Sequence, residues 1–402
     1  MTNLDYLYDK AAAANFFGKN HFVDRKLHFK ILERATVLPH KSVYVNGRWT
    51  FGLGGLVDSN GEFVKESFVY YGTGGAYTPT EVRCSPASVV YLGLFFPVWG
   101  HCITDHIRRL WFLQSDAFKR YFKDCPLVYA PWNNGATFRP IELQENFRRL
   151  FELLEVDFDR LQPITQPTQF ENVILPDESF FLEGETRFFT DEYRETIERV
   201  KSFALKNQTP SPKKIYFFYG RWQIGEERLA DYFRSKGYEI FLPENLSLDE
   251  QLNVLINAQS FASTLGSCAH NSVFLRDGME VIVVPRAADK ISETSGYQQA
   301  IGQLCNLNVT YIDSSLSIFA PDYHGPYCYV LSRQLKEFFG DTFDGYSDDD
   351  LKIFAQYLKD SLDCGLAISS DAEIYYGETL REVLTALKRR PDLAASYGVK
   401  LS

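Results

Sequence analysis

Strands and helices alternate along residues 214–312, and this alternation constrains the fold more than any other feature of the sequence. The apolar, strand-like runs occupy residues 214–219, 238–242, 261–265, 280–284 and 309–312. Continuous apolar strands joined by helical crossovers form parallel sheets that are covered on both faces. The sequence therefore predicts an α/β fold with a Rossmann-like sheet in this part of the chain.

Two local signals mark helix ends within this region. Ser247 and Glu250 have the spacing of a capping box, which predicts a helix over 248–258. Gly237 follows an amphipathic stretch at 226–235 and is expected to end that helix as its C-cap.

The first half of the chain shows a different pattern. Short β-prone runs with an Asn-Gly turn at 46–47 predict a small antiparallel β-unit over 41–75. A buried strand at 89–96 is followed by a helical pattern at 100–113. The polar, Pro-containing stretch 207–212 is the expected domain boundary. We expect a first lobe over 1–207, a nucleotide-sugar-binding lobe over 208–330, and C-terminal helices over 331–402 that pack back on the first lobe.

Composition and charge exclude several classes of protein. The formal net charge is −10 and no basic face is evident, so we expect no nucleic-acid partner. The seven cysteines are dispersed without C-x-x-C pairs, which is typical of reduced thiols in the cytosol. No signal peptide or membrane-spanning apolar run is evident. We expect a cytoplasmic protein; peripheral attachment to the inner face of the cell membrane and the oligomeric state stay open.

Two loops after predicted strands carry candidate ligand-binding residues. The loop after 261–265 contains Gly266, Ser267, His270 and Asn271; small residues there let a ligand approach the backbone beside a helix start. Ser267 is also a candidate cap for that helix. An ordinary tight turn with a satisfied histidine is the alternative interpretation.

The loop after the first strand contains Arg221, whose planar guanidinium can hold phosphate oxygens by two hydrogen bonds. A surface salt bridge is the alternative explanation for this arginine.

The helical pattern at 100–113 contains a candidate acid–base pair. His101, Asp105 and Arg109 are each separated by one helical turn and therefore share a face. Asp105 can orient His101 and increase its basicity, as a carboxylate does for a general base. A polar stripe at a domain interface would give the same pattern.

The sequence offers no convincing metal-binding motif. No Asp-x-Asp pair stands at the end of a predicted strand, and the acidic run 348–350 begins a predicted helix, where acidic residues favour the helix dipole. We therefore expect neither an obligatory metal nor another cofactor.

Taken together, these motifs resemble glycosyltransferase family 61. In the first half, the family pattern His-x-x-x-Asp-x-x-x-Arg-Leu is matched by His101, Asp105, Arg109 and Leu110. In the second half, the resemblance lies in Arg221, Glu226, the strand at 237–244, the helix start at 248–251, and the loop residues Gly266, Ser267, His270, Asn271 and Phe274. Gly225 departs from the family, which usually has Asn there.

The resemblance implies a GT-B-like enzyme of two Rossmann-like lobes that transfers a sugar with inversion from a nucleotide-sugar, a UDP-sugar being the expected donor. It implies a glycan or other hydroxyl acceptor in the assembly of surface polysaccharide, such as capsule or lipopolysaccharide. His101 or Asp105 would be the base; Arg109, Arg221, Glu226, Gly266, Ser267, His270 and Asn271 would bind the donor. A nucleotide-sugar epimerase and a non-catalytic nucleotide- or glycan-binding protein are the alternatives.

Overall fold

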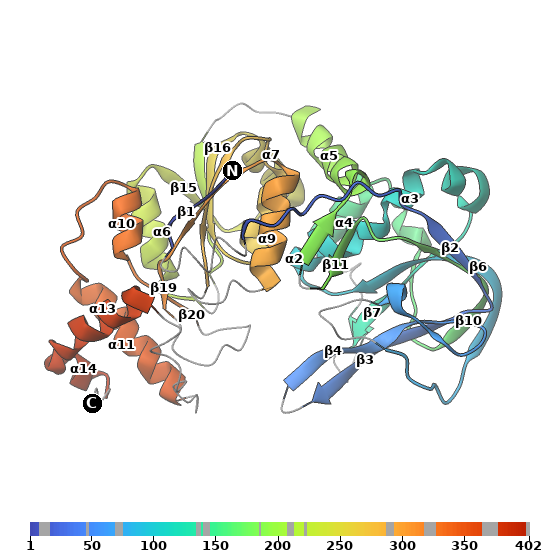
Figure 1. Ribbon diagram of the computed structural model, residues 1–402, viewed down its shortest axis with the longest axis horizontal. Helices are drawn as coiled ribbons and strands as arrows, with labels where there is room; N and C mark the ends of the chain where they lie inside the picture. Colours follow the sequence, from blue (N-terminus) through green and yellow to red (C-terminus); the bar gives the residue numbers. More distant parts are fainter. Residues whose placement is uncertain are drawn as a thin grey trace. The chain divides into compact units, whose positions relative to one another are not determined.

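The computed structural model forms two compact units, Met1–Asn20 with Asn207–Ser402 and His21–Lys206. The former is called the C-terminal unit below and the latter the N-terminal unit, and each is described by itself (Figure 1). The structure describes residues 1–7, 17–45, 48–68, 75–133, 138–139, 145–184, 186–206, 213–220, 223–286, 293–316, 327–363 and 377–398.

The C-terminal unit contains the parallel sheet that the sequence predicts. The described residues form six parallel strands in the spatial order β1-β18-β17-β16-β13-β15. Their bounds are β13 (Lys213–Phe217), β15 (Tyr238–Phe241), β16 (Ala258–Thr264), β17 (Glu280–Val284), β18 (Asn308–Ile312) and β1 (Thr2–Tyr6). The edge strand β1 comes from the start of the chain, where the sequence pattern had indicated little.

The order of these strands creates a topological switch. From β13 the chain adds β15 on one side, and then returns to add β16, β17 and β18 on the other side. This is the 2-1-3-4-5 order of doubly wound folds, in which ligands bind beyond the carboxyl ends of the strands where the direction of winding reverses. In this unit the reversal lies between β13 and β16.

Helices connect the strands and cover the sheet. They are α6 (Glu226–Ser235), α7 (Leu248–Ile256), α8 (Ser267–His270), the 3₁₀ turn η8 (Asn271–Phe274) and α9 (Glu293–Leu304). Figure 1 shows α6 and α9 on opposite faces of the sheet. The predicted capping box is confirmed, because the Ser247 hydroxyl accepts from the Glu250 amide and the Glu250 carboxylate accepts from the Ser247 amide.

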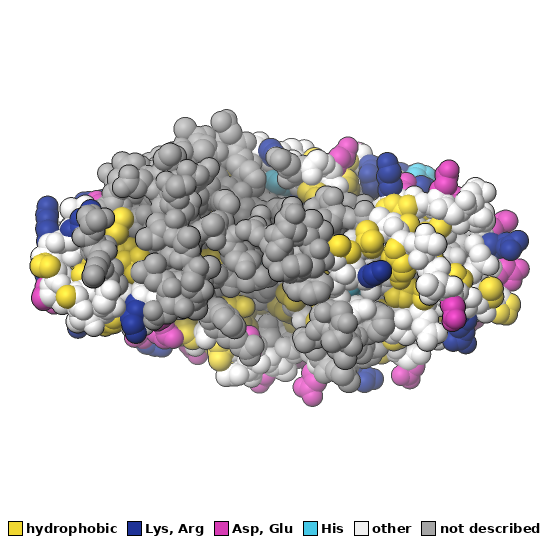
Figure 2. All heavy atoms as spheres, turned by 90° about the horizontal axis from the view of Figure 1, so that it is seen from below, with side chains coloured by type: hydrophobic (Ala, Val, Ile, Leu, Met, Phe, Trp, Pro, Cys, Tyr) yellow, Lys and Arg dark blue, Asp and Glu magenta, His cyan; other side chains and the backbone are white. Residues whose placement is uncertain are grey.

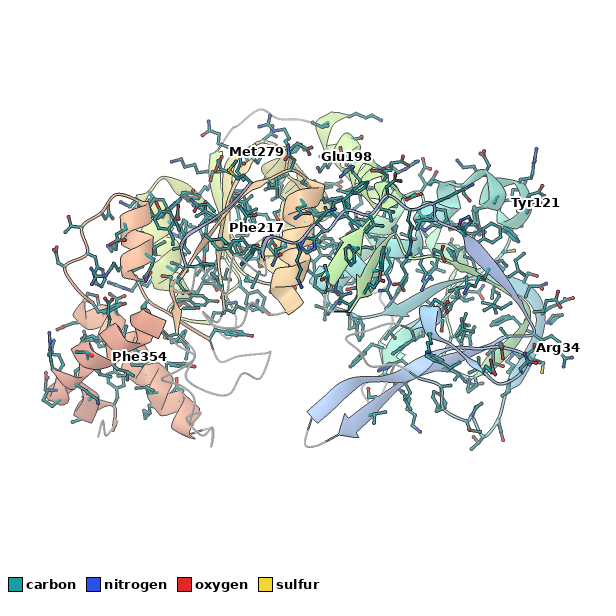
Figure 3. All side chains as sticks on the ribbon, viewed as in Figure 1. Arg34, Tyr121, Glu198, Phe217, Met279 and Phe354 are labelled. Carbon is teal, nitrogen blue, oxygen red and sulfur yellow. The ribbon has the colours of Figure 1, made fainter. Side chains whose placement is uncertain are left out.

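The C-terminal helices have a core of their own within this unit. Cys328 and Val330 at the strand β20 share a buried cluster with Phe354, Leu358 and Val383. The elements here are β14 (Gln223–Ile224), β19 (Ser315–Leu316), β20 (Tyr327–Tyr329), α10 (Arg333–Phe338), α11 (Asp348–Asp363), α13 (Gly377–Lys388) and α14 (Pro391–Ser396). Figure 3 shows Phe354 among these helices. The helices expected to pack on the first lobe thus pack on β19 and β20 of their own unit.

The N-terminal unit has a mixed sheet. Strand β10 lies parallel to β6, and β6 parallel to β7, whereas β3, β4, β5 and β2 join with antiparallel pairing. The bounds are β2 (Phe29–Glu33), β3 (Thr36–Val45), β4 (Arg48–Val57), β5 (Phe63–Val64), β6 (Arg83–Phe95), β7 (Leu127–Asn133), β8 (Phe138–Arg139), β9 (Leu161–Pro163) and β10 (Thr168–Pro176).

This sheet differs from the expected one in two respects. It is not the uniformly parallel sheet of a Rossmann-like lobe, and the antiparallel β-unit predicted at 41–75 is part of it rather than separate, because β3 pairs with β10. The chain is therefore a mixed α/β protein with several sheets. The Asn-Gly turn at 46–47 lies outside the described residues.

The predicted helix at 100–113 is irregular. It consists of α2 (Trp99–His101), a π turn η2 (Cys102–His106), a 3₁₀ turn η3 (Ile107–Arg109) and α3 (Trp111–Gln114). Beyond it lie α4 (Glu145–Leu153), the hairpin of β11 (Phe180–Glu183) and β12 (Thr186–Phe189), and α5 (Asp191–Lys206).

Figure 2 shows one face of the molecule, on which hydrophobic side chains gather over the N-terminal unit. Lys and Arg side chains on that face are interspersed with Asp and Glu. Within the described residues, no helix has the length and hydropathy needed to cross a bilayer. The six described cysteines are free thiols.

Candidate functional site

The carboxyl edge of the sheet in the C-terminal unit brings three loops together. Gly220 follows β13, Gly266 follows β16 and Arg286 follows β17, and these three strands are adjacent and parallel. Their loops therefore leave the sheet at the same edge, on both sides of the topological switch. Arg221, the predicted phosphate ligand, lies in this stretch but outside the described residues.

Gly266 lies at the centre of this edge, where the absence of a side chain leaves space beside the backbone. Its φ of 131° is one that L side chains rarely adopt, and a Cβ atom there would lie 2.3 Å from Nη2 of Arg286. The same atom would lie 2.5 Å from the guanidinium carbon. Because glycine has no side chain, the guanidinium can rest directly on the backbone between β16 and α8.

Arg286 is a residue that the sequence analysis missed. Its guanidinium carbon lies 5.2 Å from the ring centroids of both Tyr219 and Tyr327. Its Nε atom is buried and has no hydrogen-bond partner, and within the described ranges no carboxylate forms an ion pair with it. The signal that selected Arg221, an arginine just after a buried apolar strand, also applies to Arg286 and would have found it.

Glu226 holds the ends of two strands together. This buried residue begins α6, and its carboxylate accepts hydrogen bonds from the amides of Tyr219 at 3.2 Å and Gly220 at 3.1 Å. The Thr264 hydroxyl at the end of β16 donates to the same carboxylate at 3.1 Å. Sequence analysis predicted that Glu226 contacts the donor; its contacts here fix the loop after β13.

The burial of Glu226 also changes its acidity. Burial raises its pKa from the ordinary 4.5 to about 7, although the hydrogen bonds from Tyr219, Gly220 and Thr264 and the positive charge of Arg286 act in the opposite direction. At neutral pH this carboxyl group is therefore only partly ionised, and it neutralises Arg286 incompletely.

The other predicted donor ligands form the turn after β16. Gly266, rather than Ser267, stands at the N-cap of α8, and no side chain caps this helix. The Asn271 amide donates to the carbonyls of Ser267 and Cys268, each at 3.1 Å.

His270 belongs to the same turn and is buried. Its Nδ1 lies 3.1 Å from the Gln298 side-chain oxygen, and Gln298 donates to the Ser272 hydroxyl at 2.8 Å. These contacts of Asn271 and His270 hold the turn in place.

A second cluster, in the N-terminal unit, contains the predicted acid–base pair. Nδ1 of His101 lies 2.8 Å from Oδ2 of Asp105, and the Thr104 hydroxyl donates to the same oxygen at 3.0 Å. Because a carboxylate accepts, Nδ1 carries the proton and Nε2 is the basic nitrogen of the neutral ring. The His101 side chain is 20% exposed, whereas Asp105 is 1% exposed.

Positive charge surrounds the buried Asp105. Nη1 of Arg108 lies 3.6 Å from its Oδ1. Burial alone would raise the pKa of Asp105, but the hydrogen bond from His101 and the charges of His101, Arg187 and Arg108 outweigh burial and hold that pKa well below its ordinary value. Asp105 is therefore a fixed anion that orients the partly exposed ring of His101.

Arg109 lies in the core behind this pair. Its guanidinium donates to Glu178 at 2.7 Å and to the carbonyls of Pro176 and Glu66. The side chain is fully buried. The sequence predicted that Arg109 binds the donor, but these contacts assign it a structural role.

Two further observations bear on ligands. Within the described residues, no group of three or more His, Cys, Asp or Glu side chains could hold a metal ion. A pocket of about 360 Å³ lies at the opposite, amino-terminal edge of the sheet and is lined by Lys213, Lys214, Gly237, Glu239 and Gln259. Lys213 there pairs with Glu239.

Comparison with known proteins places these clusters in one family region. The family model described as Glycosyltransferase 61 matches residues 99–282, a span that includes His101, Asp105, Glu226 and Gly266. Among curated proteins, no match was found. The match confirms the resemblance to glycosyltransferase family 61 that the sequence motifs indicate.

Proposed function

We propose that this glycosyltransferase moves a sugar, with inversion at the anomeric carbon, from a nucleotide-sugar to a hydroxyl group of a glycan acceptor. The match to the family model supports a transferase with a donor and an acceptor substrate. One observation carries the mechanism: a partly exposed His101 is held through Nδ1 by the buried Asp105, within the family region.

In the proposed reaction, Nε2 of His101 removes the proton from the acceptor hydroxyl. The oxygen attacks the anomeric carbon from the side opposite the leaving group, and the bond from that carbon to the diphosphate oxygen breaks. The nucleoside diphosphate leaves with the bonding electrons, and the sugar is inverted. Asp105 stabilises the imidazolium that forms, because it is anionic and hydrogen-bonded to Nδ1.

The proposed donor site is the carboxyl edge at the switch between β13 and β16. Gly266 and the turn containing Ser267, His270 and Asn271 lie there, and the Arg221 loop is expected to complete the site. A GT-B-like organisation is part of this proposal: the donor binds to the C-terminal unit, and the base belongs to the N-terminal unit. Stabilisation of the leaving diphosphate is assigned to protein groups, without an obligatory metal.

A transfer assay tests the proposal. The purified chain is incubated with UDP-sugars and other nucleotide-sugars, with and without glycan acceptors, and the products are separated by mass. We expect acceptor-dependent loss of one nucleotide-sugar and a product of inverted configuration. Conversion of the nucleotide-sugar without an acceptor would indicate an epimerase, and tight binding without turnover would indicate a binding protein.

Surface polysaccharide, such as capsule or lipopolysaccharide, is the acceptor class that we propose to test first. Acceptor fragments of these polysaccharides, compared with unrelated oligosaccharides, separate this proposal from the broader one. Assembly of such glycans would place the enzyme at the cytoplasmic face of the cell membrane. Co-sedimentation of the chain with lipid vesicles tests that location.

A further inference from the structure

We propose that Arg286 is the phosphate ligand of the donor site, where it holds the diphosphate of the nucleotide-sugar against the backbone at Gly266. This inference rests on the proposed transferase function and adds a residue that neither the sequence motifs nor the family match identifies, since Arg286 lies beyond residue 282.

The first argument is position. Arg286 follows β17, which pairs with β16, and the guanidinium reaches across to the backbone of Gly266 at the end of β16. The cation therefore lies at the carboxyl edge of the sheet beside the switch between β13 and β16. This edge is where ligands of doubly wound sheets bind.

The second argument is the lack of an ion-pair partner among the described residues. A buried polar group without a hydrogen-bond partner costs free energy, and Nε of Arg286 is such a group. By contrast, Arg228 of the same unit is paired with Asp350 at 2.9 Å. Because no carboxylate of the described residues pairs with Arg286, its guanidinium can bind the anionic group of a ligand.

The third argument is the way in which the guanidinium is held. The rings of Tyr219 and Tyr327 lie beside it at equal distances of 5.2 Å; Tyr219 lies in the loop after β13, and Tyr327 begins β20. Aromatic contacts stabilise a guanidinium without using its N–H groups. Those groups remain available for two parallel hydrogen bonds to phosphate oxygens, the geometry in which arginine binds phosphate best.

The test measures binding of UDP and of inorganic pyrophosphate to the full chain by titration calorimetry. Arg286→Met removes the charge but keeps a long apolar side chain beside the two tyrosines. We expect it to weaken UDP binding about 10- to 100-fold, since one or two charge-assisted hydrogen bonds are lost. Pyrophosphate binding should fall by a similar factor. Uridine, which has no phosphate, should bind to both proteins alike.

A matched control lies at the other end of the same strand. Arg276 is exposed, and its carbonyl accepts a hydrogen bond from the amide of Met279. Met279 directly precedes β17, at the amino-terminal edge of the sheet (Figure 3). Arg276→Met should leave UDP binding unchanged. Arg286→Lys keeps the charge but not the planar fork of the guanidinium, and we expect it to lose UDP affinity to an intermediate extent. This second variant keeps the inference testable if Arg286→Met folds poorly. The melting temperature of each variant checks folding.

Wild-type affinity for UDP and pyrophosphate in folded Arg286 variants would overturn the inference, even where the wild-type chain transfers sugar and the proposed function stands. Pyrophosphate binding that depends on Arg286 in a chain without transferase activity would support the inference and count against the proposed function. A wild-type chain that binds neither UDP nor pyrophosphate would overturn the inference.

Discussion

Arginine side chains serve opposite purposes in the two units of this chain. In the N-terminal unit, Arg108 and Arg109 are buried and both pair with Glu178, at 3.1 Å and 2.7 Å. In the C-terminal unit, Arg286 lies at the end of a parallel strand between two tyrosines and without an acidic partner in the described chain. The difference teaches that an arginine near a strand end indicates a ligand site only when its charge is not already neutralised.

The buried acids of the two units, Asp105 and Glu226, also differ in whether they keep their charge. Asp105, surrounded by positive charge, keeps its own charge, whereas the pKa of Glu226 is raised to about 7 because burial outweighs its hydrogen bonds. The acid of the N-terminal unit is thus a permanent anion hydrogen-bonded to His101, and the acid of the C-terminal unit fixes a loop.

The largest effect is expected at His101, the proposed base. His101→Ala should lower turnover about 10²- to 10⁴-fold, because the acceptor hydroxyl loses its proton acceptor, and should leave UDP affinity nearly unchanged. Steady-state kinetics and calorimetry measure the two quantities. His28→Ala, which alters an exposed histidine of the same unit, is the control. Near wild-type turnover in His101→Ala would remove this residue from the mechanism.

The next test concerns the paired arginines. Arg109→Met leaves Glu178 without one of its two cations inside the core, and we expect the N-terminal unit to lose about 3–5 kcal/mol of stability. Denaturant unfolding measures the loss. Arg148→Met, which breaks an exposed pair with Glu152, should cost less than about 1 kcal/mol. Equal losses in both variants would contradict the structural role of Arg109.

The third test uses the acidity of Glu226. Its folded-state pKa of about 7 lies above the ordinary 4.5, so the fold favours the protonated acid. The stability that it contributes is fully present below pH 4.5 and is lost as pH rises toward about 7, by ~3 kcal/mol in total. Glu226→Gln should remove this part of the pH dependence of unfolding.

Glu227→Gln, an exposed neighbour in the same helical turn, is the control for that experiment. It should leave the pH profile of unfolding as it is in the wild-type chain. A profile for Glu226→Gln that runs parallel to the wild type between pH 4.5 and about 7 would show that the acid is not held as described.

The smallest change concerns glycine. Gly266→Ala strains the backbone and places a methyl group where the Arg286 guanidinium lies, whereas Gly237→Ala strains the backbone with no atom nearby. Each should cost about 1–2 kcal/mol of stability. Only Gly266→Ala should weaken UDP binding, by about tenfold, because it displaces the cation. Equal UDP affinity in the two variants would separate Gly266 from the binding site.

The sequence predicted the sheet of the C-terminal unit because its strands are apolar throughout and alternate with helices, a local pattern. The sheet of the N-terminal unit depends on long-range pairing, such as β3 and β2 with β10, which no local pattern reveals. The segment 100–113 was expected as a regular helix, and its π turn has no periodicity that would signal it.

The candidate site was predictable to a similar, partial extent. The spacing of His101 and Asp105 predicted their hydrogen bond. The same spacing also led to the prediction that Arg109 binds the donor. Helical spacing shows which residues share a face, but it does not show that Glu66, Pro176 and Glu178, which are distant in the sequence, bury Arg109. The position of Arg286 just after an apolar strand could have selected it, as it selected Arg221. Its contacts with Tyr219 and Tyr327 could not be predicted, because these tyrosines are far away in the sequence.

A crystal structure of the chain with UDP tests the central claim, that the donor binds at the carboxyl edge of β13 and β16. The account predicts diphosphate oxygens within about 3 Å of the Arg286 guanidinium, beside Gly266. UDP bound at the opposite edge of the sheet, in the pocket lined by Lys213 and Lys214, would contradict it.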